Sequence, residues 1–326
     1  MCPAIQDGKT GVESWSGRRI VLAGGSGFLG TALAGHFSKA GAQVVVLTRQ
    51  PKGRADGIRE MAWDGRTVGP WHSELDGAAL LVNLAGFSVN CRHTPEHRRL
   101  IVDSRVHSVE ALGSALARVS SPPPVWLQSS SLAIYGNTGE APCDEDAPHG
   151  GDFSTDVCHQ WEGALARCCP SGVRSCLLRI GIVLGTEGGA LPVLTRLTRW
   201  GLGGSAGNGR QHISWIHVED FIQLVDFLAR TKTASGVFNV VSPGSATNAE
   251  FMRTLRRALD RPWSPPAPAW AVKLGSLFLG TESHLILEGR RGLPRRALEA
   301  GFSFRHPTLE GALADLYPRK PHVSNA

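Results

Sequence analysis

The sequence lacks a long apolar run and an apolar N-terminal block. Its longest apolar stretch, residues 78–87, is far shorter than the roughly 20 residues that a membrane-spanning helix requires. Residues 1–17 include Asp7, Lys9 and Glu13, a composition that predicts no signal peptide. We therefore expect a cytoplasmic protein with a loose tail over residues 1–17 and no membrane partner.

No Cys-x-x-Cys motif occurs among the seven cysteines, which stand at positions 2, 91, 143, 158, 168, 169 and 176. An odd number of cysteines favours reduced thiols over a disulfide framework, and zinc sites usually contain closely spaced cysteine pairs. The sequence thus predicts neither a disulfide nor a metal site.

The chain has only a small excess of positive charge. It contains 34 Lys and Arg residues and 28 Asp and Glu residues, for a net charge of +6. From residue 250 onward, 12 basic residues face 7 acidic ones, so most of the excess lies in the C-terminal part. No aromatic-interleaved or groove-reading motif accompanies these arginines. We expect no nucleic-acid partner.

What is present is the composition of a globular protein. The 39 glycines and 20 prolines follow no triplet period, which excludes collagen. Hydrophobic residues make up 42% of the chain and include nine tryptophans, which excludes intrinsic disorder. A chain of 326 residues predicts about two domains.

Short apolar runs alternate with helical patterns through the first two-thirds of the chain. Such runs, joined by helices, predict an α/β fold with a doubly wound parallel sheet covered on both faces. The predicted strands are residues 18–24, 43–48, 80–84, 125–129, 173–180 and 236–241. The predicted helices are residues 28–40, a long helix capped by Thr94 with an apolar stripe of Leu100, Val109, Leu112 and Leu116, and a helix from Thr155 to about Arg167.

The character of the sequence changes near residue 246. A helix over residues 248–259 is followed by a proline-rich linker over 261–268 and by short helices that end near Leu316. We predict a first domain over residues 18–241, a small and mostly helical C-terminal domain over 242–318, and a tail over 319–326.

A glycine-rich turn joins the first strand to the first helix. Residues 24–30 read Gly-Gly-Ser-Gly-Phe-Leu-Gly and fit G-x-G-x-x-G. In this motif the glycines permit a tight turn, close approach of a pyrophosphate and close packing of the helix on the strand. The helix N-terminus then binds the phosphates. The sequence therefore predicts a dinucleotide-binding site at this turn.

The end of the second strand indicates which dinucleotide is bound. An acidic residue there would bind a ribose 2′-hydroxyl and select NAD, but the strand ends in Thr48-Arg49. Arg49, with Lys52 and Arg54 behind it, offers positive charge to a 2′-phosphate. We expect NADP(H) rather than NAD(H), with an exposed basic turn as the alternative interpretation.

Further motifs resemble those of one family. They are Asn83-Leu84-Ala85-Gly86, Ser104-Arg105, Ser129-Ser130-Ser131 with Tyr135-Gly136, Arg179-Ile180-Gly181, Gly201-Leu202-Gly203-Gly204, Gln211 with Ser214-Trp215-Ile216-His217, and Thr247-Asn248 before Phe251. From about residue 18 to 317, the chain resembles an atypical short-chain dehydrogenase/reductase of the extended, sugar-epimerase-like kind. It is similar to the branch called "epimerase family protein", which carries a C-terminal domain of unknown function.

The resemblance implies a Rossmann domain that holds NADP(H), with a substrate cleft between it and the C-terminal part. Arg105 is among the implied cofactor contacts, although an ordinary helix-surface arginine fits its spacing equally well. The expected cofactor-binding residues are Gly24, Ser26, Gly27, Phe28, Leu29, Gly30, Thr48, Arg49, Leu84, Ala85, Gly86, Arg105, Ser129 and Gly181. The expected substrate-side residues are Gln211, Trp215 and His217.

The sequence departs from the wider family at the catalytic positions. Typical members use a serine and a Tyr-x-x-x-Lys pair, in which the lysine lowers the pKa of the tyrosine phenol. Ser131 fits the serine position, but Cys158 and Glu162 occupy the positions of the pair. Because Glu162 would raise the pKa of a nearby thiol, Cys158 is predicted to be a packed or ligand-facing residue more readily than a nucleophile.

Other residues could supply an acid or base. Tyr135 follows a predicted strand end, where α/β active sites gather, and His217 and Asp220 lie after a later strand. Packing of Tyr135 and a structural hydrogen bond of His217 are the alternatives. Ser131, Tyr135, Cys158 and Glu162 are thus the candidate catalytic residues.

Two functions remain open from the sequence. The first is an NADP(H)-dependent oxidoreductase or epimerase-like enzyme that acts on an unknown small-molecule substrate by hydride transfer. The second, suggested by the missing Tyr-x-x-x-Lys pair, is a non-catalytic NADP(H)-binding sensor or scaffold. Related folds often form homodimers through the helices that correspond to residues 96–118 and 156–167.

Overall fold

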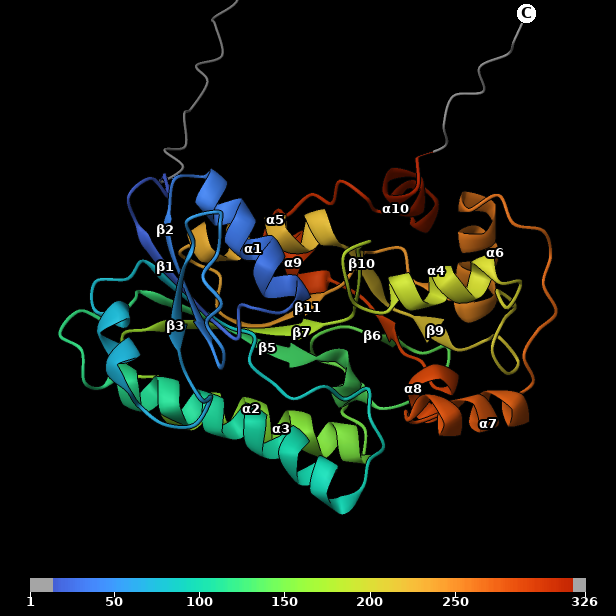
Figure 1. The fold of residues 1–326 in the computed structure, drawn as a ribbon, viewed down its shortest axis with the longest axis horizontal. Coiled ribbons are helices and arrows are strands. Elements are labelled where there is room, and N and C mark those ends of the chain that lie inside the picture. The colour runs from blue at the N-terminus through green and yellow to red at the C-terminus, as the bar shows by residue number, and fades with distance from the viewer. Residues whose placement is uncertain (1–13, 319–326) are drawn as a thin grey trace, which may run out of the picture.

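A computed structural model describes residues 14–318 and confirms the predicted α/β fold (Figure 1). Its centre is a seven-stranded sheet in which every pair of neighbouring strands is parallel. In spatial order the strands are β11 (Gly236–Val240), β7 (Arg174–Ile180), β5 (Val125–Ser131), β4 (Leu80–Asn83), β1 (Arg19–Ala23), β2 (Gln43–Thr48) and β3 (Arg59–Ala62). Of these, only β3 was not predicted, because its sequence Arg-Glu-Met-Ala has no apolar run.

Helices cover both faces of the sheet, as a Rossmann fold requires (Figure 1). On one face lie α1 (Phe28–Lys39) and α5 (Val218–Arg230), which bury Phe37 and Phe221 against the strands. On the other face lie α2 (Pro95–Leu116) and α3 (Phe153–Cys168), with the short 3-10 helix η1 (Pro70–Leu75). Strands that are buried on both faces explain the continuous apolar runs of the sequence.

Two details of the helices differ from prediction. The α3 helix begins earlier than Thr155, because the Asp152 side chain caps it by accepting a hydrogen bond from Thr155 N at 2.8 Å. Leu100 was assigned to the buried stripe of α2, but it is 41% exposed, because its side chain lines a cavity described below. The predicted Thr94 cap of α2 is confirmed.

The tail predicted over residues 1–17 includes a tryptophan that belongs to the folded part of the protein. Trp15 is buried, packs edge-on against Phe37 with ring centroids 5.5 Å apart, and donates a hydrogen bond from Nε1 to Asp226 Oδ1. Residues 1–13 and the predicted tail over 319–326 lie outside the described residues.

The C-terminal region is mostly helical. Most of it forms a cluster beside the sheet, but one of its helices packs against the sheet itself. Helices α4 (Leu191–Arg199), α6 (Asn248–Ala258) and α10 (Leu309–Leu316) form a separate hydrophobic cluster. Helix α9 (Arg295–Glu299) instead returns to the sheet and buries Ala297 there. The remaining elements are α7 (Ala269–Leu279), α8 (His284–Leu287), 3-10 helix η2 (Leu132–Tyr135), and the short strands β6 (Pro142–Cys143), β8 (Ile182–Leu184), β9 (His212–Ile213), β10 (Trp215–His217), β12 (Ala246–Thr247) and β13 (Arg291–Gly292).

Within residues 14–318, none of the helices combines the length and the apolar character needed to cross a bilayer. The described cysteines form no disulfide; Cys2 lies outside the described range.

Candidate functional site

The glycine-rich turn between β1 and α1 is packed so closely that two of its glycines cannot be replaced without movement. Gly24 has φ +71°, and a Cβ atom there would lie 2.7 Å from the backbone N and Cα of Ala85. A Cβ atom at Gly30 would lie 2.4 Å from Gly25 Cα. The turn therefore sets the N-terminus of α1 directly against the ends of β1 and β4.

The first turn of α1 is open to an anion. Its N-cap residue is Gly27, which has no side chain to cap the helix, and the first turn contains no acidic residue. The backbone N–H groups of Phe28, Leu29 and Gly30 thus keep the positive end of the helix dipole uncompensated. This is the geometry that binds phosphate groups in other proteins.

A cavity of about 400 Å³ lies at the carboxyl ends of β1, β2 and β4. Eight of the residues expected to bind the cofactor line it: Gly24, Ser26, Gly27, Thr48, Arg49, Leu84, Ala85 and Gly86. The structure thus brings together residues from three separate parts of the chain. The carboxyl edge of a parallel sheet, where strand order reverses, is where ligands bind in such folds.

The far wall of this cavity was not anticipated from the sequence. It is formed by the segment after β3 (Trp63, Asp64, Gly65 and Arg66), by the first half of α2 (Leu100, Asp103, Ser104 and His107) and by Phe87 from the loop after β4. Nε1 of Trp63 and Nδ1 of His107 are buried without a hydrogen-bond partner. The polar segment after a weak strand offers no periodic signal, so sequence patterns could not locate this wall.

The three basic residues predicted near a 2′-phosphate are not equivalent. Arg49 lines the cavity, is exposed, and has no ion pair among the described side chains. Arg54 is instead paired with Asp56, with Nη2 and Oδ2 2.6 Å apart, and neither Arg54 nor Lys52 lines the cavity. Arg66, which was not predicted, joins Arg49 at the cavity wall.

Two consecutive residues of α2 hold the loop that follows β4. The hydroxyl of Ser104 accepts a hydrogen bond from Phe87 N at 2.8 Å, and Arg105 Nη1 donates to Phe87 O at 3.0 Å. At the start of the loop, Asn83 Oδ1 accepts from Ala85 N at 3.0 Å. The Ser104-Arg105 motif therefore shapes the loop over Leu84, Ala85 and Gly86.

Arg105 is a cation without an anion. Its guanidinium lies beside Gly86 and over the Trp161 ring, 5.0 Å from the centroid, and burial lowers its pKa to about 10. No carboxylate of residues 14–318 pairs with it. Arg105 is not among the residues that line the cavity, and its Nη1 donates to Phe87 O and Ile101 O, so the structure gives it the role of holding this loop.

The serines at the end of β5 have three different environments. Ser129 Oγ is buried without a partner, and Ser130 Oγ donates to Glu162 Oε1 at 2.5 Å. Ser131 Oγ accepts from Ala133 N at 3.1 Å and caps η2, and this leaves its own hydrogen available to a ligand. Of the three, Ser131 is only partly buried.

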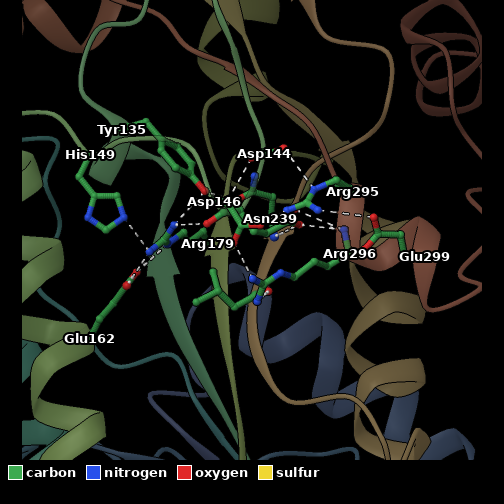
Figure 2. A network of polar contacts seen from close by, with 12 residues as sticks. Tyr135, Asp144, Asp146, His149, Glu162, Arg179, Asn239, Arg295, Arg296 and Glu299 are labelled. Carbon is green, nitrogen blue, oxygen red and sulfur yellow. Dashed lines mark hydrogen bonds and ion pairs between the residues drawn. The ribbon is translucent and has the colours of Figure 1, made fainter.

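Glu162, at the position of the missing lysine, is neutralised by Arg179 at the end of β7 (Figure 2). The pair is bidentate, with Arg179 Nε 3.0 Å from Oε1 and Nη2 2.9 Å from Oε2. Despite desolvation, the Glu162 partner raises the pKa of the Arg179 guanidinium. The site therefore contains a buried ion pair where typical members carry a single positive charge.

Tyr135 belongs to the same network (Figure 2). Its hydroxyl donates to Asn239 Oδ1 at 2.8 Å and accepts from Arg179 Nη1 at 2.9 Å, and burial raises its pKa. His149 Nε2 accepts from Arg179 Nη2 at 3.1 Å. Both hydrogen-bonding functions of the phenol are used internally, which favours the packing interpretation of Tyr135.

Cys158 is buried beside this network, with Sγ 3.8 Å from Ser131 O. Burial and, secondarily, the charge of Glu162 raise the pKa of its thiol to about 12. A thiolate is therefore scarce at neutral pH, and this environment does not activate a nucleophile.

The residues expected on the substrate side are mostly packing residues. Trp215 is fully buried in the cluster of α4, α6 and α10, and Gln211 Nε2 donates to the carbonyls of Ala206 and Ile286. Gly181, expected at the cofactor, leaves no room for a side chain because a Cβ atom would lie 2.6 Å from Ser214 O. None of these three residues lines the described cavity, and Nε1 of Trp215 is buried without a hydrogen-bond partner.

His217 caps α5, where its Nδ1 accepts a hydrogen bond from Glu219 N at 3.1 Å. An accepting Nδ1 places the proton of the neutral ring on Nε2, which faces Asp315 Oδ2 at 3.4 Å. His306 stacks on the ring, and these three side chains bring potential ligand atoms within 4.8 Å of one another. Because a protonated Nε2 cannot bind a metal, the cluster is better described as a helix cap. Asp220, the other candidate here, accepts from Arg305 N and His306 N.

We expect His217→Asn to make the protein less sensitive to acid. Burial, with the neighbouring His306, lowers the His217 pKa below its usual 6.5. As the pH falls below 6.5, His217 binds more protons in the unfolded chain than in the folded one, so the free energy of unfolding falls. Protonation at Nδ1 also removes a cap worth about 1 kcal/mol.

An asparagine side chain can cap α5 without titrating. Between about pH 7.5 and about pH 5.5, the melting temperature should fall less for the variant than for the wild type. Parallel curves for wild type and variant would contradict the role of His217 in acid sensitivity.

A matched pair of substitutions in α1 tests the packing of the glycine turn. Gly30→Ala should weaken NADPH binding at least tenfold, because its Cβ atom forces α1 away from the turn. Gly35→Ala lies in the same helix with no atom within 4 Å of its Cβ, so it should leave binding unchanged and stabilise the helix by roughly 0.5–1 kcal/mol. If both variants bind NADPH equally well in calorimetric titrations, the close contact of α1 with the glycine turn is not needed for binding.

Phe28, the first residue of α1, extends over a loop made of glycines. A Cβ atom at Gly185 would lie 2.5 Å from Phe28 Cζ, and one at Gly188 would lie 2.7 Å from Phe28 Cβ. This loop, after β8, thereby closes against the N-terminus of α1.

Comparisons with known proteins show the family to which this chain belongs. A family model described as "NAD dependent epimerase/dehydratase family" matches residues 20–241, and "Domain of unknown function (DUF1731)" matches residues 267–316. Epimerase family protein SDR39U1 of Bos taurus is 34% identical over 303 residues, which cover 91% of this chain and 99% of the relative. Epimerase family protein YfhF of Bacillus subtilis is 33% identical over 299 residues, covering 91% of this chain and 97% of its own.

A solved structure extends the likeness to the fold. The crystal structure of human epimerase family protein SDR39U1 (isoform2) with NADPH superposes with a TM-score of 0.83 at 31% identity. The match covers 93% of this chain and 100% of the human one.

Proposed function

Since this chain belongs to the NAD-dependent epimerase/dehydratase family, we propose that it binds NADP(H) in the cavity beside the glycine turn and transfers hydride between the cofactor and a small-molecule substrate. The observation that carries the proposal is the cavity itself. It combines close-packed glycines, an uncapped helix N-terminus and an unpaired arginine at the end of β2. A homologue crystallised with NADPH supports the choice of cofactor.

The residues present fit a phosphorylated dinucleotide. The diphosphate would lie on the N–H groups of Phe28 and Leu29, and the 2′-phosphate would meet Arg49. Among the acidic residues of the cavity wall, Asp64 lies nearest in sequence to β3. Its carboxylate oxygens accept hydrogen bonds from Arg66 N, Thr67 N and Thr67 Oγ1. It is therefore poorly placed to replace the ribose-binding carboxylate of an NAD-selective site.

When bound, the nicotinamide ring supplies a carbon that gives or accepts hydride. Ser131 keeps a hydroxyl hydrogen that can stabilise a substrate oxygen. The Glu162–Arg179 pair holds Ser130 and the end of β5 in place. Burial raises the pKa of the Tyr135 phenol and outweighs the lowering effect of Arg179. In this proposal Ser131 orients the substrate, and the proton donor is not Tyr135 or Cys158.

The enzymatic role is tested by the loss of NADPH absorbance with a panel of ketones, enals and nucleotide sugars. With any substrate that is turned over, Ser131→Ala should lower turnover about tenfold, the value of one lost hydrogen bond, while the NADPH dissociation constant stays the same. Unchanged turnover would remove Ser131 from the site, and a parallel loss of NADPH binding would indicate a structural effect.

A non-catalytic NADP(H)-binding sensor or scaffold is the second candidate. It is favoured by the raised thiol pKa of Cys158 and by the internal hydrogen bonds of Tyr135, which leave no activated acid at the usual positions. For such a protein, NADPH should raise the melting temperature without being consumed by any member of the panel. Turnover that is sensitive to Ser131→Ala would exclude it.

A further inference from the structure

Three tryptophans project from the C-terminal side of the molecule. Trp200 follows α4, Trp263 lies between α6 and α7, and Trp270 is in the first turn of α7; they are 69%, 74% and 69% exposed. Large apolar side chains that are this exposed are costly in water, and when they gather in one place they mark an interaction surface.

One seam joins the segments that carry the three tryptophans. Ala267 N donates to Ser205 O at 2.8 Å, and Gly207 N donates to Ala267 O at 2.8 Å. Trp263 and Trp270 lie four and three residues from Ala267, and Trp200 lies five residues before Ser205, so each is within roughly 18 Å of the seam. In Figure 1 the end of α4, the α6–α7 linker and the start of α7 lie at the same end of the molecule.

Helix α7 continues this surface. Its residues Trp270, Leu274 and Phe278 are spaced four apart and therefore share one helix face, and all three are exposed, Phe278 by 83%. Leu277, beside them, and Leu202, near the seam, are exposed as well. We call Trp200, Leu202, Trp263, Trp270, Leu274, Leu277 and Phe278 the tryptophan face.

The segments that carry the tryptophan face are basic. Residues 191–209 and 249–279 contain seven Lys and Arg residues and only two acidic ones, a net charge of +5 out of the +6 of the whole chain. Arg196 lies over the Trp200 ring, 5.7 Å from its centroid, and Arg199 is one residue from it. Exposed Arg253, Arg261 and Lys273 lie on the elements that carry the other tryptophans.

We propose that the tryptophan face docks on the surface of an anionic phospholipid bilayer. Tryptophan prefers the headgroup region, leucine and phenylalanine enter the acyl boundary, and arginines bind lipid phosphates, so the apolar and basic elements act together. A nucleic acid would neutralise the arginines but would leave Leu202, Leu274 and Leu277 in water. A protein partner is separated from a bilayer by the experiment below, because tryptophan and arginine, such as Trp200 with Arg196 over its ring, are also common in protein interfaces.

This proposal departs from the expectation of no membrane partner, which rested on the lack of a spanning segment. The exposure of tryptophans cannot be recognised in a sequence, because tryptophan is usually buried. A surface of this kind would hold the protein on a membrane without insertion of any helix across it.

Co-sedimentation of the full chain with vesicles tests the proposal. The protein should bind vesicles of phosphatidylcholine with phosphatidylserine, bind phosphatidylcholine alone much more weakly, and be released by salt. Trp200→Ala/Trp263→Ala/Trp270→Ala should lower binding at least tenfold. The double variant Arg199→Gln/Arg261→Gln should bind anionic vesicles about 25-fold more weakly, because each lost charge lowers binding roughly fivefold.

Matched controls come from exposed residues elsewhere in the chain. Leu298→Ala in α9 removes an exposed apolar side chain and Arg118→Gln after α2 removes an exposed arginine, and both should leave vesicle binding unchanged. NADPH binding should be equal in all variants, which shows that they are folded. Failure of the wild type to bind the anionic vesicles would overturn the proposal, as would full binding by the triple tryptophan variant. A dimer in light scattering that the triple variant converts to a monomer, without vesicle binding, would assign the face to a second copy of the chain.

Discussion

Arg179→Met should lower the free energy of unfolding by about 3–5 kcal/mol, the usual effect of removing one partner from a buried ion pair. The guanidinium of Arg179 contacts the Glu162 carboxylate, the Tyr135 hydroxyl and His149 Nε2, and it is almost completely buried. Its loss leaves a buried carboxylate without a cation, and this is more costly than the lost packing. Urea unfolding followed by tryptophan fluorescence measures the change.

The double variant Glu162→Gln/Arg179→Met serves as the control. It removes both charges and preserves an acceptor for the Ser130 hydroxyl, so it should be more stable than Arg179→Met alone. If the double variant is no more stable than the single one, the cost comes from packing and not from an unpaired charge.

Arg49→Asp should weaken NADPH binding about 100-fold and change NADH binding little. A charge-assisted hydrogen bond to phosphate contributes roughly 1.5–3 kcal/mol, and an aspartate adds repulsion that only the 2′-phosphate experiences. Arg49 lines the cavity and has no competing ion pair among the described residues, so its charge is available to a ligand. Isothermal titration with both dinucleotides measures the ratio.

Arg54→Asp is the matched control for charge near this site. Because Arg54 is paired with Asp56 outside the cavity, its replacement should affect both dinucleotides alike and only slightly. Equal losses of NADPH and NADH binding in Arg49→Asp would assign Arg49 to the exposed basic turn and would remove the preference for NADP(H).

The framework of the site was predictable because its signals are local. Continuous apolar runs specify strands buried on both faces, and the glycines of residues 24–30 need one turn geometry whatever surrounds them. These signals predicted the sheet and the glycine turn with Arg49 at one side of the cavity, whereas Leu84 and Ala85 were implied only by the family resemblance.

The rest of the site depends on contacts between segments that share no pattern. Glu162 was predicted to raise the pKa of a nearby thiol, but nothing in its sequence neighbourhood indicates that Arg179, on a later strand, pairs with it. Similarly, the Trp63–Arg66 wall follows a polar edge strand, and Leu100 fits an apolar stripe although it faces a cavity. Such pairings are set by the packing of α2 and α3 on the sheet, which no single stretch of sequence encodes.

The contact between Phe28 and the glycine loop after β8 has an evolutionary consequence. Because the ring occupies the space where side chains at Gly185 and Gly188 would lie, these positions cannot diverge independently. A larger residue at either glycine requires a smaller residue at position 28, at the start of the phosphate-binding helix. Among diverging descendants of this chain, substitutions at 28, 185 and 188 should therefore be correlated, and the loop should change only together with the helix that it closes.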